Sequence, residues 1–254
     1  MKSEEVKEIA AFIAEYAACL LGSGVHTSRV IRNSGRIGES LGVEIRMTTL
    51  HKTFVLTVSE ETNGHSFTRV VDIPAFGVNF DFNASLSSLS WEAFDGRLPL
   101  ETIRFRYGQI LSRGLLSPWV VLGMVSLANA AFCKLFAGDW VAAGVVGLAT
   151  AIGFFIRLEM QRRHINHFIT FTLSAFVSSL CASLCLWLGH TPEIALATSV
   201  LYLIPGVPLV NGVIDIVEGH TLTGFSRLIQ AVLLVICIAC GLSCSLLLVK
   251  NSLL

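Results

Sequence analysis

The chain has 254 residues, of which 53% are apolar and 14% are charged, and its formal net charge is zero. Charged residues make up about 25% of a typical soluble domain, so this composition indicates a membrane protein and excludes an ordinary soluble one. No basic run is present that would indicate nucleic-acid binding, and we expect no nucleic-acid partner.

Charge is unevenly distributed along the chain. Acids and bases are frequent in residues 1–113, whereas between residues 115 and 156 only Lys134 and Asp139 are charged. We therefore predict two domains, a water-soluble one at 1–113 and a transmembrane one at 114–254. The first 24 residues begin with acids and show no secretory signal, so the soluble domain is expected to lie in the cytoplasm.

The first domain is expected to be a small α+β domain. Apolar residues at helical spacing predict an amphipathic helix at 3–21, and Thr27 or Ser28 is expected to cap a second helix that runs to about Leu41. The elements expected after it are strands at 43–50, 53–60 and 66–73, a short fourth strand at 79–82, and helices at 85–95 and 99–112.

The second domain contains five apolar stretches of about 20 residues, the length that crosses the core of a bilayer. The five expected transmembrane helices lie at about 118–137, 139–157, 168–188, 193–216 and 226–249. Arginines gather in the loops on one side, which predicts a cytoplasmic N-terminus and a periplasmic C-terminus. Cysteines fall mainly in the apolar stretches and are interpreted as packing residues, so no metal and no cofactor is expected.

The fourth stretch contains "LIPGVPLVNGVIDIVEGH", with Pro205, Gly206 and Pro208 in the middle of an apolar run. Two prolines around a glycine are expected to kink or unwind a helix. Carbonyl groups freed at such a break are costly in lipid unless protein or a water-filled cavity covers them. Broken helices of this kind hold the substrate in many transporters, although a proline kink can also be purely structural.

Polar residues follow the break at i, i+4 and i+7, where Asn211, Asp215 and Glu218 share one helix face. An acid inside a membrane usually serves protons, ions or a partner charge, so Asp215 is expected to take up a proton or to pair with Arg227. The alternative is that Asp215 lies at the membrane interface. Asn129 in the first stretch is interpreted as either a helix–helix hydrogen bond or a substrate contact.

The segment "SGVHTSR" at 23–29 is weighed in two ways. It could bind an anion at a helix N-terminus, or it could be a plain helix cap.

Three segments resemble the threonine/serine exporter family, and especially its two-chain form, which is linked to succinate export. They are "GSGVHTSRV", "CKLFAGDW" and "LIPGVPLVNGVIDIVEGHTLTGFSR". The resemblance implies an exporter subunit for small carboxylates in the bacterial inner membrane, with succinate or a related dicarboxylate, or threonine and serine, as substrate. Since one-chain members carry a second set of five spans, it also implies a second small transmembrane subunit and a hetero-oligomer.

We expect substrate binding or coupling to involve the family block and one polar residue of the first span. These residues are Pro205, Gly206, Pro208, Asn211, Asp215, His220, Arg227 and Asn129. An enzyme is not expected, because the sequence has neither a nucleophile elbow nor paired acids in its spans. The alternative function is a non-transporting membrane sensor or assembly partner whose cytoplasmic domain is the working part.

Overall fold

The computed structural model describes the chain except for residues 1–2, 61–64, 75, 115, 189–190 and 253–254. Contacts divide the chain into two compact units. Unit 1 is Met1–Gly114 with Gly206–Ile229, and unit 2 is Leu115–Pro205 with Gln230–Leu254. The segment after the proline break therefore belongs to the same unit as the N-terminal residues.

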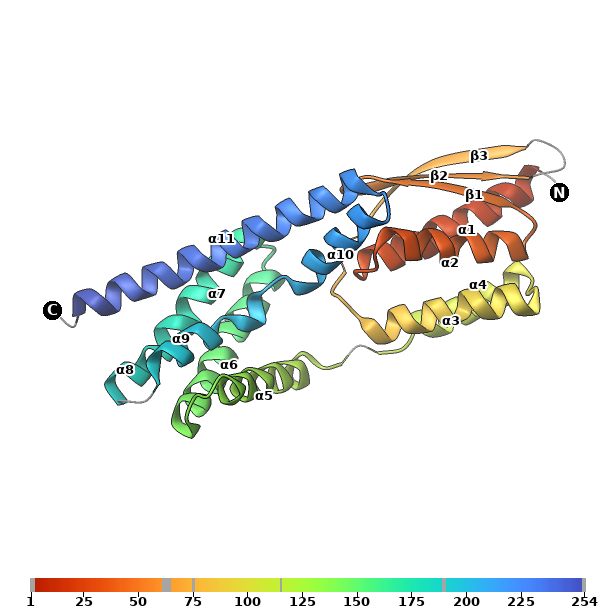
Figure 1. The fold of residues 1–254 in the computed structure, drawn as a ribbon. Helices are drawn as coiled ribbons and strands as arrows, with labels where there is room; N and C mark the ends of the chain where they lie inside the picture. The colour runs from red at the N-terminus through yellow and green to blue at the C-terminus, as the bar shows by residue number, and fades with distance from the viewer. Residues whose placement is uncertain (1–2, 61–64, 75, 115, 189–190, 253–254) are drawn as a thin grey trace. The chain divides into compact units, whose positions relative to one another are not determined.

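Unit 1 is an α+β unit in which a small sheet, a middle pair of helices and a second pair of helices form layers (Figure 1). Its elements from residues 1–114 are α1 (Ser3–Gly22), α2 (Thr27–Ser40), β1 (Glu44–Thr49), β2 (Thr53–Ser59), β3 (Ser66–Asp72), α3 (Phe80–Gly96) and α4 (Leu100–Leu111). The sheet is antiparallel with the order β1-β2-β3. Helix α10 (Gly206–Val217) and the first turns of α11 (Thr221–Ser252) complete the unit.

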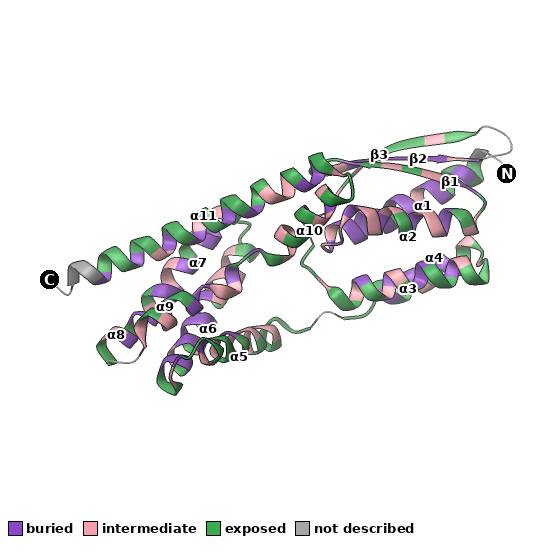
Figure 2. Ribbon diagram, viewed as in Figure 1, coloured by how far each residue is buried: buried purple, intermediate pink, exposed green. Residues whose placement is uncertain are grey.

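The core of unit 1 lies on both sides of α1. Alternation along β2 buries Phe54, Leu56 and Val58 on one face of the sheet (Figure 2). On α1, Ile13 is fully buried, and Tyr16 donates a 2.8 Å hydrogen bond to the carbonyl of Leu86 on α3. An α-helix in a middle layer must be apolar around most of its circumference, which explains why α1 buries more than the single face expected.

Two local expectations in unit 1 are wrong. Residues 79–82 form no strand, because the side chain of Asn79 accepts a 3.0 Å hydrogen bond from the Phe82 N–H and caps α3, which begins at Phe80. The N-cap of α2 is His26, and it makes no side-chain capping bond, so neither Thr27 nor Ser28 is the cap.

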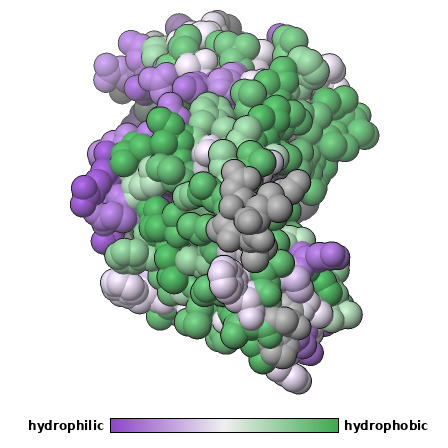
Figure 3. Space-filling model, turned by 90° about the vertical axis from the view of Figure 1, so that its left-hand side faces the viewer, coloured by the Kyte–Doolittle hydropathy of each residue, from purple (hydrophilic) through white to green (hydrophobic). Residues whose placement is uncertain are grey.

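All regular secondary structure in the described residues of unit 2 is helical. Its elements besides the rest of α11 are α5 (Pro118–Leu135), α6 (Trp140–Arg162), α7 (His167–Ala182), α8 (Leu184–Leu188), α9 (Pro192–Ser199) and the 3₁₀ turn η1 (Leu201–Leu203). Four helical stretches in the described chain are long and apolar enough to cross a membrane, or five if the bent pair that joins α9–η1 to α10 is counted as one span. Hydrophobic side chains dominate the face drawn in Figure 3, as lipid contact requires.

Candidate functional site

The fourth apolar stretch is broken, as the sequence predicts. Helix α9 ends at Ser199, η1 follows, and α10 begins at Gly206, so the buried Pro205 lies between helical segments. Pro208 falls in the first turn of α10, where a missing N–H costs no intrahelical bond. The two prolines therefore act differently: Pro205 lies in the interruption and Pro208 belongs to the start of the new helix.

Asp215 on α10 is fully buried and lies at the N-terminus of α2. One carboxylate oxygen, Oδ1, accepts a 2.8 Å hydrogen bond from the backbone N–H of Thr27. The other, Oδ2, lies 3.0 Å from Nη1 of Arg227 on α11. The pairing of Asp215 with Arg227 is thus confirmed, and the positive end of the α2 dipole adds a second favourable partner for the carboxylate.

Side chains of α10 and α11 also bind the loop between α1 and α2. The Asn211 amide donates a 2.7 Å hydrogen bond to the carbonyl of Gly24, and Nη2 of Arg227 donates a 3.2 Å bond to the carbonyl of Val25. Gly24 has φ +88°, a conformation that favours glycine. The anion at this helix N-terminus is therefore a carboxylate of the protein itself, Asp215, and all of these contacts lie within unit 1.

A second carboxylate, that of Glu218, lies beside the first turn of α2. Its oxygens are 3.2 Å from Nδ1 of His26 and 3.6 Å from Nη1 of Arg32. A hydrogen bond from Ser28 is the main cause that lowers the pKa of Glu218, and the positive charges of His26 and Arg32 act in the same direction. Burial lowers the pKa of His26, although Glu218 and Asp215 act in the opposite direction.

Helices α10 and α11 approach each other through glycine. A Cβ on Gly224 would lie 2.5 Å from the carbonyl oxygen of Gly212, so only glycine fits at this crossing. The turn between the helices is closed by a 2.7 Å hydrogen bond from the His220 N–H to the Asp215 carbonyl. The His220 side chain makes no hydrogen bond or ion pair within the described part of the chain.

The structure groups Asn211, Asp215 and Arg227 around one loop but places Asn129 elsewhere, in unit 2. There the Asn129 amide donates hydrogen bonds of 2.9 Å to Thr150 Oγ1 on α6 and 3.3 Å to the Thr198 carbonyl on α9. This is the helix–helix bond that was one of its two interpretations. The backbone groups of Gly24, Val25 and Thr27 were missing from the predicted site, although the anion interpretation of residues 23–29 pointed to them.

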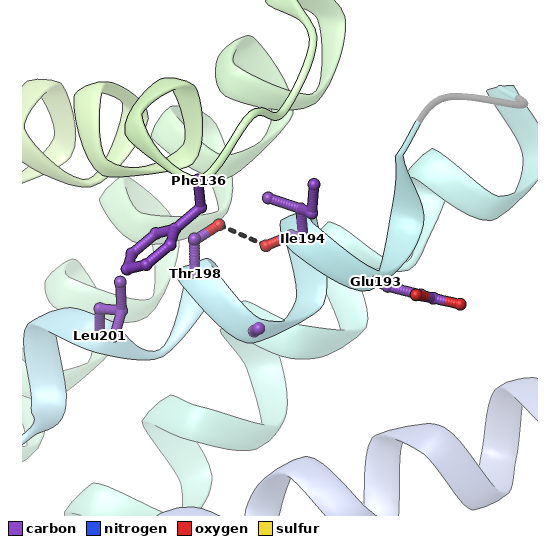
Figure 4. A pocket seen from close by; sticks show the side chains of 6 residues that line it. Phe136, Glu193, Ile194, Thr198 and Leu201 are labelled. Atoms are coloured by element: carbon purple, nitrogen blue, oxygen red, sulfur yellow. Dashed lines mark hydrogen bonds between the residues drawn. The ribbon is translucent and has the colours of Figure 1, made fainter.

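A pocket of about 360 Å³ lies in unit 2 beside α9 (Figure 4). Its wall is mostly apolar, and the Thr198 hydroxyl is engaged in a 2.7 Å bond to the Ile194 carbonyl. The charged residue of its lining is Glu193, which would repel a carboxylate. The described residues also contain no cluster of three or more His, Cys, Asp and Glu side chains that could hold a metal ion.

The apolar helices and the comparison with known sequences define a multi-pass membrane protein of an exporter class. A family model described as "Putative threonine/serine exporter" matches residues 11–249, and the chain belongs to this family. It is 31% identical over 246 residues to "Probable succinate transporter subunit YjjP" of Escherichia coli, covering 95% of this chain and 94% of that protein. No solved structure matches.

Two further relatives extend the comparison. The protein of the same description from Klebsiella aerogenes is 31% identical over 245 residues, which cover 94% of this chain and 93% of the relative. An uncharacterized protein of Haemophilus influenzae is 22% identical over an alignment 274 positions long, which covers 89% of this chain and 87% of the relative.

Proposed function

We propose that this chain is one subunit of an exporter of small carboxylate metabolites in the bacterial inner membrane. It works with a second small transmembrane subunit in a hetero-oligomer. Its N-terminus is cytoplasmic and its C-terminus periplasmic, following the arginine-rich loops. Succinate or a related dicarboxylate is the preferred substrate class, with threonine and serine as the alternative, because two relatives at 31% identity carry the description of a succinate transporter subunit.

The observation that carries this proposal is the contact of Asp215 with Thr27 and Arg227 directly after a broken apolar helix. A buried ion pair is worth little for stability by itself but has a large effect when one partner changes charge. Such a pair suits a device that responds to binding or protonation. A purely structural kink after Pro205 would not require charged groups at this position.

In the proposed mechanism, Asp215 couples export to protons. Protonation removes the negative charge that Arg227 and the N-terminus of α2 stabilise, so the contact between α10 and the loop after α1 weakens. The hydrogen bonds from Asn211 to the Gly24 carbonyl and from Arg227 to the Val25 carbonyl then remain. Pro205, Gly206 and Pro208 supply the break at which the chain changes direction, and His220 closes the turn that presents Asp215.

An efflux assay distinguishes the proposed exporter from the competing function, a non-transporting sensor. Efflux is measured in cells preloaded with labelled succinate or labelled threonine, which produce this chain alone or with the membrane protein encoded beside it. Efflux of one label only when both chains are present supports a split exporter and names its substrate. No efflux of either label, with both chains verified in the membrane, rejects the proposed substrates.

The proline break provides a second test. A Pro205→Ala, Pro208→Ala double variant that assembles normally with its partner but loses efflux supports transport through the broken helix. Normal efflux by this variant would show that the break is only a structural kink with no role in transport. Pro118→Ala is the matched control, because Pro118 starts α5 and interrupts no span.

A further inference from the structure

One arginine in unit 2 lies in an apolar helix without a counter-charge. Arg157 belongs to α6, a candidate membrane span, and is half-buried. Its guanidinium carbon lies 4.7 Å from the ring centre of Phe171 and 5.9 Å from that of Phe154. No carboxylate of the described residues lies within ion-pair distance of it, whereas Arg163, the C-cap of α6, pairs with Glu159 at 2.8 Å.

Side chains with hydroxyl groups share a helix face with Phe171, the ring that Arg157 contacts. Phe171, Ser174 and Ser178 share one face of α7 at i, i+3 and i+7. The Ser178 hydroxyl lies 2.9 Å from the Tyr202 hydroxyl on η1. The Ser174 hydroxyl is fully buried and has no hydrogen-bond partner among the residues that the structure describes. An unpaired buried hydroxyl is unfavourable, and an acceptor oxygen of a ligand would satisfy it.

The backbone of α6 approaches this group of hydroxyls closely. Gly153 lies one turn before Arg157, and a Cβ at this position would collide with the hydroxyls of Ser178 and Tyr202. Phe154 contacts Tyr202 as well as Arg157, because its ring centre lies 6.0 Å from that of Tyr202. Arg157, Ser174 and Tyr202 thus come from three elements of unit 2 that meet directly before the break at Pro205.

We propose that Arg157 and Ser174 bind a carboxylate group of the exported substrate, and this inference rests on the proposed function. A guanidinium donates two parallel N–H groups to a carboxylate, and aromatic rings beside its plane leave its N–H edge available. The Ser174 hydroxyl supplies a further donor. An arginine in a membrane helix is costly and is usually retained for a substrate path, and discontinuous helices are where transporters place such paths.

The competing explanation is that Arg157 merely anchors α6 at the membrane surface. An anchor requires positive charge alone, so Arg157→Lys would be equivalent to wild type. A bidentate carboxylate site requires the planar guanidinium, so lysine would be inferior. Anchoring also gives no reason for the unpaired Ser174 hydroxyl.

The test measures succinate binding by the purified complex of this chain with its partner, through thermal stabilisation in detergent, with neutral succinamide as the ligand control. Arg157→Gln is expected to weaken succinate binding roughly 10- to 100-fold, Arg157→Lys and Ser174→Ala less. Arg163→Gln is the matched control and should bind as wild type. The melting temperatures without ligand identify any variant that is misfolded. If Arg157→Gln does not fold, Arg157→Lys still tests the site, because it retains the positive charge.

The outcomes separate the two proposals. In the first outcome, the wild type exports succinate and binds succinate but not succinamide. If Arg157→Gln and Arg157→Lys then bind succinate as tightly as the wild type, the Arg157 site is rejected and the exporter stands. If wild type neither exports nor binds succinate or threonine, the proposed function is rejected and the site with it. Selective loss of binding in the Arg157 and Ser174 variants, with Arg163→Gln unchanged, supports the site.

Discussion

The carboxylate of Asp215 accepts a 2.8 Å hydrogen bond from the backbone N–H of Thr27, a residue 188 positions earlier in the chain. A helix N-terminus usually satisfies its free N–H groups with the side chain of its own N-cap. Here the N-cap of α2 makes no such bond, and a distant acid takes that role. Folding of the N-terminal residues is therefore coupled to the position of α10.

Removing the charge of Asp215 should destabilise unit 1. Asp215→Asn keeps an oxygen for the Thr27 N–H but leaves Arg227, whose side chain is only 19% exposed, without a counter-charge. Breaking a buried pair in this way costs about 3–5 kcal/mol, measured as thermal unfolding in detergent. The variant should remain in the membrane but lose efflux. Full-rate efflux would rule out the coupling role.

A double-mutant cycle isolates the pair itself. Asp215→Asn with Arg227→Gln should recover part of the lost stability, because no unpaired charge remains. Glu44→Gln is the control, since Glu44 pairs with Arg46 on the surface and its loss should cost less than about 1 kcal/mol. Additive losses in the double variant would show that the two residues do not interact.

Gly224 should not tolerate a methyl group. The Cβ of Gly224→Ala would press on the backbone carbonyl of Gly212, which cannot rotate away, so α10 and α11 must separate at a cost of about 1–3 kcal/mol. Gly35→Ala in α2 meets no atom within 4 Å and should be neutral or stabilise by up to about 1 kcal/mol. Equal melting temperatures for the two variants would contradict the close crossing.

Acidification should weaken unit 1 through His26. Burial lowers its pKa below the unfolded value of about 6.5, so the unfolded chain binds the proton more readily. Unit 1 is therefore most stable above about pH 6.5, where His26 is neutral in both states. This stability is lost as the pH falls from about 6.5 through the pKa of His26 in the folded state. Glu218, whose pKa is also lowered, adds a loss only below about pH 4.5. Melting temperatures at pH 7.5 and 5.5 should differ less for His26→Gln than for wild type, with exposed His65→Gln as the control.

Asn129 should prove structural. Asn129→Ala removes the bonds that join α5 to α6 and α9, at a cost of about 1 kcal/mol for a bond between membrane helices. Ser126→Ala, which removes a bond within α5 only, is the control and should cost less. A large change in apparent substrate affinity at unchanged melting temperature would instead make Asn129 a substrate contact.

Much of the fold was predictable because local patterns specify it. Apolar runs of bilayer length, the alternation in β2 and the helical spacing in α1 each depend on neighbouring residues, and the structure contains helices or strands at these places. The short strand at 79–82 failed because one side chain, Asn79, caps a helix there. The break at Pro205 was predictable from the covalent geometry of proline alone.

The sequence by itself determined the membrane composition, the broken fourth stretch and the family, and it offered the pairing of Asp215 with Arg227 as one of several alternatives. Only the tertiary structure decided that Asp215 lies at the N-terminus of α2, and that Arg157 of α6 packs against Phe171 of α7. Neither relationship has a periodicity along the chain. Both depend on contacts between different helices, and packing alone brings these together.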